Sequence, residues 1–156
     1  MEHERPFGIE ELFFSTTDRK GIIRAGNSVF ARVAGYEPEE LVGRPHNVIR
    51  HPDMPRAALP AACTYLEAGR PIAAYVKNRA SDGAPYWVLA TVVPSGEGSL
   101  SVRMKPSSPY LAAVKSIYAD LLATEHAAEE AGLPRKAVIE AGVERLGELL
   151  PTAACM

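Results

Sequence analysis

Titratable and conformationally rigid residues crowd into one short stretch of the sequence, HNVIRHPDMP at residues 46–55. Two histidines, one arginine, one aspartate and two prolines occupy these ten positions. A metal site, a catalytic pair, a ligand-binding loop and a plain structural turn all use residues of these types. The rest of the sequence has to decide among the four.

Metal and hydrolytic chemistry are both disfavoured. A closed transition-metal shell takes three or four ligands, with partners that orient each imidazole. Only His46, His51 and Asp53 are present here, and Pro52 stiffens the turn between two of them. A His–Asp catalytic pair needs a neighbouring nucleophile, and no Gly-x-Ser-x-Gly motif or cysteine beside a histidine supplies one. We therefore expect no metal, no catalytic residue and no enzyme.

Length and composition indicate one ordinary globular domain, with a helical appendage as a possible addition. Of the 156 residues 47% are hydrophobic and 23% charged, and the formal net charge of −2 gives no reason to expect nucleic acid as a partner. Cys63 and Cys155 are not spaced as a metal site and are expected to be free thiols. We see no signal peptide and no apolar run of membrane-spanning length. The protein is expected to be cytoplasmic.

The first half of the chain combines two short strands with short helices. Residues 13–18 and 21–27 are separated by turn residues and predict a hairpin. Helical spacing follows at 27–36, with Asn27 or Ser28 as N-cap and Gly35 as C-cap. EPEELVG at 37–43 predicts a second short helix that begins near Pro38. Residues 54–69 predict a longer helix, kinked at Pro60.

The second half predicts three strands and then more helix. Residues 71–80, 85–95 and 99–106 are strand-like and are separated by turn signals. In the last strand, alternation predicts that Leu100, Val102 and Met104 form the buried face. The predicted fold is α+β, with a five-stranded antiparallel sheet and short helices on one face. We expect an N-terminal extension at 1–9, this domain at 10–106 and a C-terminal helical segment at 107–156.

Two further predictions concern the strands at 71–80 and 85–95. Tyr86 and Trp87 are adjacent, so they point to opposite faces, and one of them should face the helices. Lys77, Asn78 and Arg79 precede a Ser-Asp-Gly turn and are expected to form a solvated strand end.

Two segments carry a family resemblance: STTD…GIIRAGNSVFARVAGYEPEELVGRPHNVIRHPDMP and VKNRASDGAPYWVLATVVP. Through these segments, residues 10–106 resemble the PAS sensor fold. The Asn-x-x-Phe, Gly-Tyr and Leu-x-Gly pattern is general to many PAS domains. Arg-His-Pro-Asp-Met-Pro, Val-Lys-Asn-Arg and Tyr-Trp-Val are more specific, and are similar to the PAS domain of bacterial aerotaxis receptors.

That resemblance implies non-covalent FAD binding in the cleft between helices and sheet, with Asn27, Arg50, His51 and Asp53 as contacts. It also implies a sensor that reports flavin redox state to a neighbouring signalling module in aerotaxis or chemotaxis. One position departs from the family, because Ile72 stands where the receptors often have tryptophan. Tyr75 or Trp87 is expected to supply the missing aromatic wall.

The residue types are compatible with this implication but leave alternatives open. The planar guanidinium of Arg50 suits a pyrophosphate or a ring carbonyl, and Asp53 suits ribose hydroxyls. Arg50 and Asp53 could equally form a local ion pair that holds the turn, and Asn27 could be simply a helix cap. A haem held by His46 or His51 is a further alternative.

The apolar stripe at 111–122 predicts a docking surface. We expect the 109–131 helix to contact either a second copy of the chain or a downstream signalling module. The alternative function is a PAS domain with another ligand, haem or a small molecule, or with none, that acts as a dimerisation module.

Overall fold

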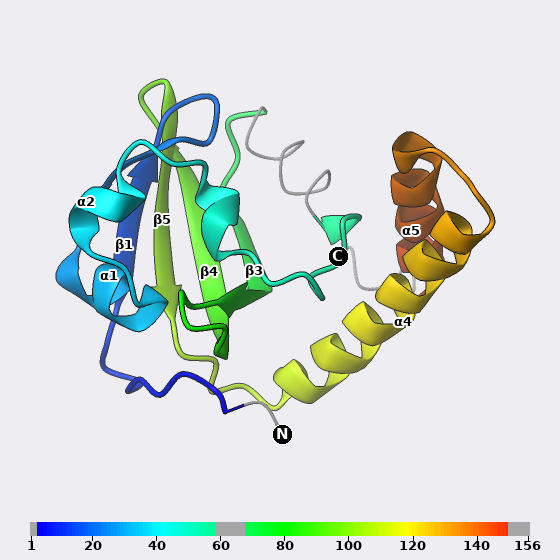
Figure 1. Cartoon of the computed structure of the whole chain (residues 1–156), viewed down its shortest axis with the longest axis horizontal. Helices are drawn as coiled ribbons and strands as arrows, with labels where there is room; N and C mark the ends of the chain where they lie inside the picture. The colour runs from blue at the N-terminus through cyan, green and yellow to red at the C-terminus, as the bar shows by residue number, and fades with distance from the viewer. Residues whose placement is uncertain (1–2, 59–67, 150–156) are drawn as a thin grey trace. The chain divides into compact units, whose positions relative to one another are not determined.

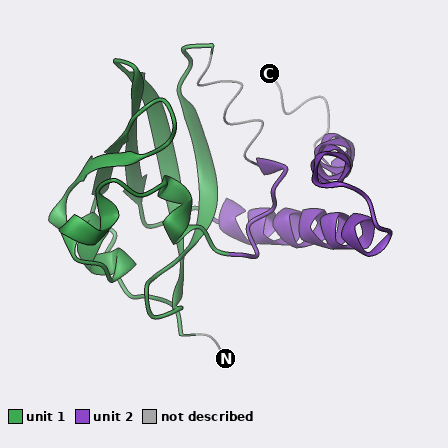
Figure 2. Cartoon of the chain, turned by 45° about the horizontal axis from the view of Figure 1, so that its top comes forward, with its two compact units in different colours: residues 1–51, 65–108 green, residues 52–64, 109–156 purple. Residues whose placement is uncertain are grey.

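The computed structural model describes residues 3–58 and 68–149, and the chain divides into two compact units. The first consists of residues 1–51 and 65–108, and the second of residues 52–64 and 109–156 (Figure 2). Residues 52–64, which the sequence assigned to the PAS domain, group with the C-terminal helices in this division. Part of the helix expected at 54–69 lies outside the described residues.

A five-stranded antiparallel sheet forms the first unit, as predicted, with short helices on one face (Figure 1). Its strand order is β2-β1-β5-β4-β3. The elements are β1 (Phe13–Thr17), β2 (Ile23–Gly26), α1 (Ser28–Ala34), α2 (Pro38–Leu41), the 3-10 helix η1 (His46–Ile49), β3 (Ile72–Arg79), β4 (Pro85–Ser95) and β5 (Gly98–Met104). β5 is the middle strand, so its inward side chains lie at the centre of the sheet.

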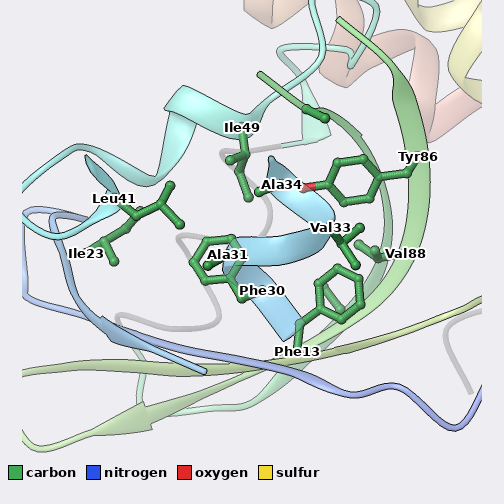
Figure 3. Packing of buried hydrophobic residues seen from close by; sticks show 12 residues of the cluster. Phe13, Ile23, Phe30, Ala31, Val33, Ala34, Leu41, Ile49, Tyr86 and Val88 are labelled. Atoms are coloured by element: carbon green, nitrogen blue, oxygen red, sulfur yellow. The ribbon is translucent and has the colours of Figure 1, made fainter. Parts of the chain in front are cut away.

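The helix-covered face of the sheet carries the hydrophobic core. Phe30 and Val33 of α1 pack with Phe13 of β1 and with Tyr86 and Val88 of β4 (Figure 3). All five side chains are at most 1% exposed. Tyr86 is therefore the member of the Tyr86–Trp87 pair that faces the helices.

The predicted buried face of β5 is wrong. Ser101 and Arg103 are 7% and 2% exposed, whereas Met104 is 36% exposed. Register explains the inversion, because Arg103 lies opposite Phe13 of β1 and Ala90 of β4, which are both core residues. The polar side of β5 thus faces the helices.

Both predicted caps of α1 are confirmed. The Asn27 side-chain oxygen accepts the backbone N–H of Phe30 at 3.1 Å. Gly35 ends the helix at a φ of 75°, a left-handed conformation that glycine adopts without a Cβ penalty.

Residues near the N-terminus pack on the first unit. Arg5 donates its backbone N–H to Pro85 O at 2.8 Å and pairs with Asp82 at 3.0 Å. The Phe7 ring packs edge-on against Phe13, with 5.0 Å between ring centroids. The predicted 1–9 extension therefore contributes to the core of this unit.

Two helices, α4 (Tyr110–Glu130) and α5 (Arg135–Leu149), dominate the second unit. Arg145 of α5 forms a bidentate pair with Asp120 of α4, at 2.7 and 3.0 Å. Leu121, from the predicted apolar stripe, is fully buried. Among the described residues, neither helix is long and apolar enough to cross a membrane.

A buried carboxylate joins α4 to residues 56 and 57. Glu125 is 2% exposed, and its two oxygens accept the backbone N–H groups of Arg56 at 3.0 Å and Ala57 at 2.9 Å. Gly142 of α5 completes the packing, because a Cβ there would lie 2.9 Å from the Ala57 Cβ. A side chain from α4 thus holds the segment that follows the Arg-His-Pro-Asp motif.

Candidate functional site

A buried polar cluster lies on the helix-covered face of the sheet and is centred on Arg103. The guanidinium donates to Ser15 Oγ at 2.8 Å, to Ser101 Oγ at 3.3 Å and to His46 Nε2 at 2.7 Å. Its carbon atom lies 4.5 Å from the centroid of the Phe30 ring, a cation–π distance. Strands β1 and β5, the 3-10 helix η1 and helix α1 each contribute to the cluster.

The positive charge of Arg103 has no negative partner among the residues that the structure describes. None of the ion pairs in residues 3–58 and 68–149 includes Arg103, and its Nε makes no hydrogen bond within that part of the chain. Burial lowers the pKa of Arg103 to about 10, so the group stays protonated at neutral pH. The cluster is thus a buried and uncompensated cation.

Tyr86 brings a second unsatisfied polar atom to the same face. Its side chain is 1% exposed, and its hydroxyl has no hydrogen-bond partner among the described residues. Burial raises the pKa of Tyr86, which keeps the phenol protonated and able to donate. Unsatisfied buried polar groups are rare, because each one forfeits its hydrogen bonds to water.

His46 is neutral in this cluster. The residue as a whole is half-buried, but its Nε2 edge contacts the fully buried Arg103, and burial followed by the Arg103 charge lowers the pKa of His46 to about 3. Since Nε2 accepts a hydrogen bond from the Arg103 guanidinium, the neutral ring carries its own proton on Nδ1. The Nε2 lone pair that a haem iron would need is already engaged by a cation.

This arrangement predicts an acid-sensitive fold. The unfolded chain takes up a proton at His46 below about pH 6.5, whereas the folded protein takes up none until about pH 3. Between these values the free energy of unfolding should fall on acidification, by at most about 1.4 kcal/mol per pH unit. His46→Gln keeps an acceptor for Arg103 and removes the titration. Urea unfolding of both proteins between about pH 7 and pH 4.5 should show a shallower pH dependence for the variant; parallel curves would contradict the assignment.

The two family-specific motifs meet at the edge strand β3. Arg50 forms an isolated antiparallel bridge with Asn78, and the His51 N–H donates to Lys77 O at 3.2 Å. Asn78 is 3% exposed, so the expected solvated strand end is wrong at that residue. Backbone pairing therefore fixes Arg50 and His51 against the Val-Lys-Asn-Arg segment. Arg50 is half-buried and His51 is 6% exposed.

Asn27 and Asp53, the other two residues implied by the resemblance, belong to different units of the chain. The Asn27 side chain is engaged with backbone, since it also accepts Phe14 N–H at 3.1 Å and donates to Leu12 O at 2.8 Å. Asp53 is exposed and belongs to the second unit, beyond the point where the chain leaves His51.

The aromatic pair lies on the other face of the sheet. Tyr75 is opposite Leu89 and Trp87 is opposite Lys77, whereas the buried Asn78 is opposite the buried Tyr86. Strand alternation then assigns Tyr75 and Trp87 to the face that α1 does not cover. Neither residue therefore lies on the helix-covered face, where one of them was expected to supply the aromatic wall. Ile72 lies on the same face of β3 as Asn78, because an even number of residues separates them.

Sequence reasoning missed Arg103, Ser101 and Ser15. Each is polar and lies in a strand where alternation assigns polar residues to solvent. The available signal was the excess of small polar residues in both β1 and β5, which share a register across the sheet centre.

The protein-family comparison matches a model described as the PAS fold to residues 25–104. The chain belongs to the PAS family. The aerotaxis receptor of Escherichia coli strain K12 is 39% identical over 122 residues, which cover 75% of this chain and 24% of that protein. Phototropin-2 of Oryza sativa subsp. japonica is 36% identical over 73 residues, covering 47% of this chain and 8% of that one. The PAS chain thus spans a quarter or less of these relatives.

Solved structures support the fold. A light-oxygen-voltage domain studied with a flavin analogue superposes with a TM-score of 0.57, at 20% identity, over 67% of this chain and 83% of that chain. The light-state LOV domain of aureochrome 1 gives a TM-score of 0.56 at 21% identity, over 72% and 89%. At these identities the likeness concerns the PAS architecture alone.

Among the described residues, no group of three or more His, Cys, Asp or Glu side chains could hold a metal ion. The chemistry that the cluster offers is hydrogen bonding and positive charge on the helix-covered face.

Proposed function

We propose that this PAS domain binds FAD non-covalently and reports the flavin redox state in an aerotaxis- or chemotaxis-type pathway in the cytoplasm. The domain acts as a binding module and not as an enzyme. One observation carries the proposal: a charged, hydrogen-bonding cluster occupies the helix-covered face, where a purely structural core would be apolar. The likeness to an aerotaxis receptor and to a domain studied with a flavin analogue supports FAD as the ligand.

The residues present fit this cofactor. Arg50 and His51 are held against β3 by backbone pairing, so their positions in the chain are fixed. Arg50 would bind the pyrophosphate or a ring carbonyl through its planar guanidinium. The Asp53 carboxylate would accept hydrogen bonds from ribose hydroxyls. The unsatisfied Arg103 Nε and Tyr86 hydroxyl are donors that a heteroaromatic ring could meet. FAD, when bound, supplies reversible electron uptake.

Output would pass from the turn at residues 50–53 to helix α4. The chain leaves the first unit at His51 and enters the second at Pro52. A few residues later, the amides of Arg56 and Ala57 are bound by Glu125 of α4. A ligand that shifts the turn therefore acts on α4 through a short stretch of backbone, provided that it binds the two arrangements with different affinity. A second copy of the chain or a downstream module would contact α4.

A second candidate is a PAS domain for another anionic small molecule. The uncompensated charge of Arg103 would bind a carboxylate as well as a flavin. Ile72 also stands at the position where the receptors often have tryptophan. Saturating small carboxylates should then raise the unfolding temperature of the protein while FAD does not.

Arg50→Ala is expected to weaken FAD binding by about tenfold or more, since a hydrogen bond to a charged group contributes about 1.5–3 kcal/mol. Asp53→Ala should weaken binding in the same direction by a smaller factor. Equilibrium titration of the full chain with FAD, followed by flavin fluorescence, measures both.

Arg79→Ala is the matched control, because Arg79 is an exposed arginine at the end of β3. It should leave the FAD affinity unchanged. If Arg50→Ala and Asp53→Ala both bind FAD as tightly as the wild type, the assignment of these two residues is wrong.

A further inference from the structure

Arg103 is a costly residue to bury at the centre of the sheet. Burying a guanidinium is costly unless opposite charge and full hydrogen bonding compensate it. Its partners here are two serine hydroxyls, a neutral imidazole and an aromatic ring, and none of them carries negative charge. An apolar side chain at this position would avoid the cost.

One donor of the buried guanidinium is unused within the described part of the chain. The terminal nitrogens are engaged by Ser15, Ser101 and His46, which fixes the plane of the group. The Nε atom is buried and has no acceptor among the described residues. This fixed cation thus keeps one donor available for an electronegative group that residues 3–58 and 68–149 do not supply.

We propose that Arg103 binds the electronegative edge of the flavin ring and favours its reduced form. This inference rests on the proposed FAD function and deepens it. Two-electron reduction with uptake of one proton leaves a single negative charge on the ring, delocalised over N1 and the C2 carbonyl. A fixed positive charge against that edge stabilises the reduced ring more than the neutral oxidised one. Arg103 thus raises the midpoint potential at which the sensor switches.

His46 and the two serines are positioning residues in this account. Because His46 is neutral, it accepts a hydrogen bond from Arg103 and adds no charge of its own. Stacking of its ring on Phe30, at 6.0 Å between centroids and 14° between planes, holds the imidazole in place. The net charge that the flavin meets is then that of Arg103 alone.

The test compares midpoint potentials of FAD-loaded wild-type protein, Arg103→Gln and Arg79→Gln during reduction by dithionite in the presence of a reference dye. Arg79→Gln removes the same charge from an exposed position of the same sheet. Arg103→Gln should disfavour the reduced form by about tenfold, which lowers the potential by about 30 mV for a two-electron couple. Arg79→Gln should not change it.

Arg103→Lys keeps the charge and is expected to remain closer to the wild-type potential than Arg103→Gln. For a variant that binds FAD weakly, the ratio of its affinities for reduced and oxidised FAD gives the shift in midpoint potential on binding, by linkage. FAD binding with an unchanged potential and an unchanged affinity ratio in Arg103→Gln would overturn this inference alone. Absence of FAD binding by the wild-type chain would overturn the proposed function with it.

Discussion

Replacing Glu125 by alanine is expected to lower the free energy of unfolding by about 2–6 kcal/mol. Both carboxylate oxygens accept backbone amides, Arg56 N–H at 3.0 Å and Ala57 N–H at 2.9 Å, in a site where Glu125 is 2% exposed. Each amide that loses its acceptor without gaining water costs about 1–3 kcal/mol. Urea unfolding followed by circular dichroism measures the change through the denaturation midpoint.

Glu129 provides the matched control one helical turn further along α4. It pairs with Arg56 at 2.6 Å, but both side chains are more than 40% exposed. Exposed ion pairs contribute about 0–1 kcal/mol, so Glu129→Ala should have a small effect. Equal losses in Glu125→Ala and Glu129→Ala would contradict the role assigned to the buried carboxylate, and with it the link between residues 56–57 and α4.

Phe30→Ala is expected to destabilise the protein by about 3–5 kcal/mol, the usual range for deleting a buried phenylalanine. Phe30 is 1% exposed and packs closely, since a Cβ on Gly26 would lie 2.6 Å from the ring. Its ring also faces Arg103 at 4.5 Å. The variant therefore loses core packing and one contact of the buried guanidinium. Urea unfolding again gives the size of the effect.

Two companion variants separate packing from the cation–π contact. Phe30→Leu keeps much of the apolar volume and loses the aromatic face. Its free energy of unfolding should therefore lie between those of the wild type and Phe30→Ala. Phe14→Ala changes a phenylalanine of β1 that is 40% exposed, and should cost under about 1 kcal/mol. If Phe14→Ala were as damaging as Phe30→Ala, the assignment of the helix-covered face as the core would be wrong.

The sequence was sufficient to predict the fold because the local signals agreed with one another. Turn residues separated five strand-like segments, and helical spacing with Asn27 and Gly35 marked both ends of α1. The resemblance to PAS domains then fixed the topology. These signals are short-range, and each could be recognised within about ten residues.

The buried polar cluster could not be predicted in this way. Alternation separates the two faces of a strand but does not say which face the helices will cover. Ser101 and Arg103 therefore looked solvent-facing, and only strand pairing brings Arg103 to Ser15, 88 residues earlier. The sequence drew attention to His46 and His51 as possible ligands, whereas the structure engages His46 with a cation.

For Tyr75 and Trp87 the limit was register. Each strand shows the same alternation whichever face is inward. The expectation that Tyr75 or Trp87 lines the cleft beside the helices therefore depends on how the strands pair, which alternation does not show. The register of β3 with β4 places both residues on the face of Leu89 and Lys77. Ile72 therefore remains an aliphatic residue on the helix-covered face, with no aromatic substitute from this pair.

Uptake of FAD by the purified 156-residue chain is the most direct test of the central claim. The protein is incubated with excess FAD, passed through a desalting column and examined by absorption spectroscopy. The proposed function predicts a yellow protein that retains near-stoichiometric FAD, with the absorption bands of a bound oxidised flavin. A colourless protein that takes up none, or a red protein with a Soret band, would contradict it.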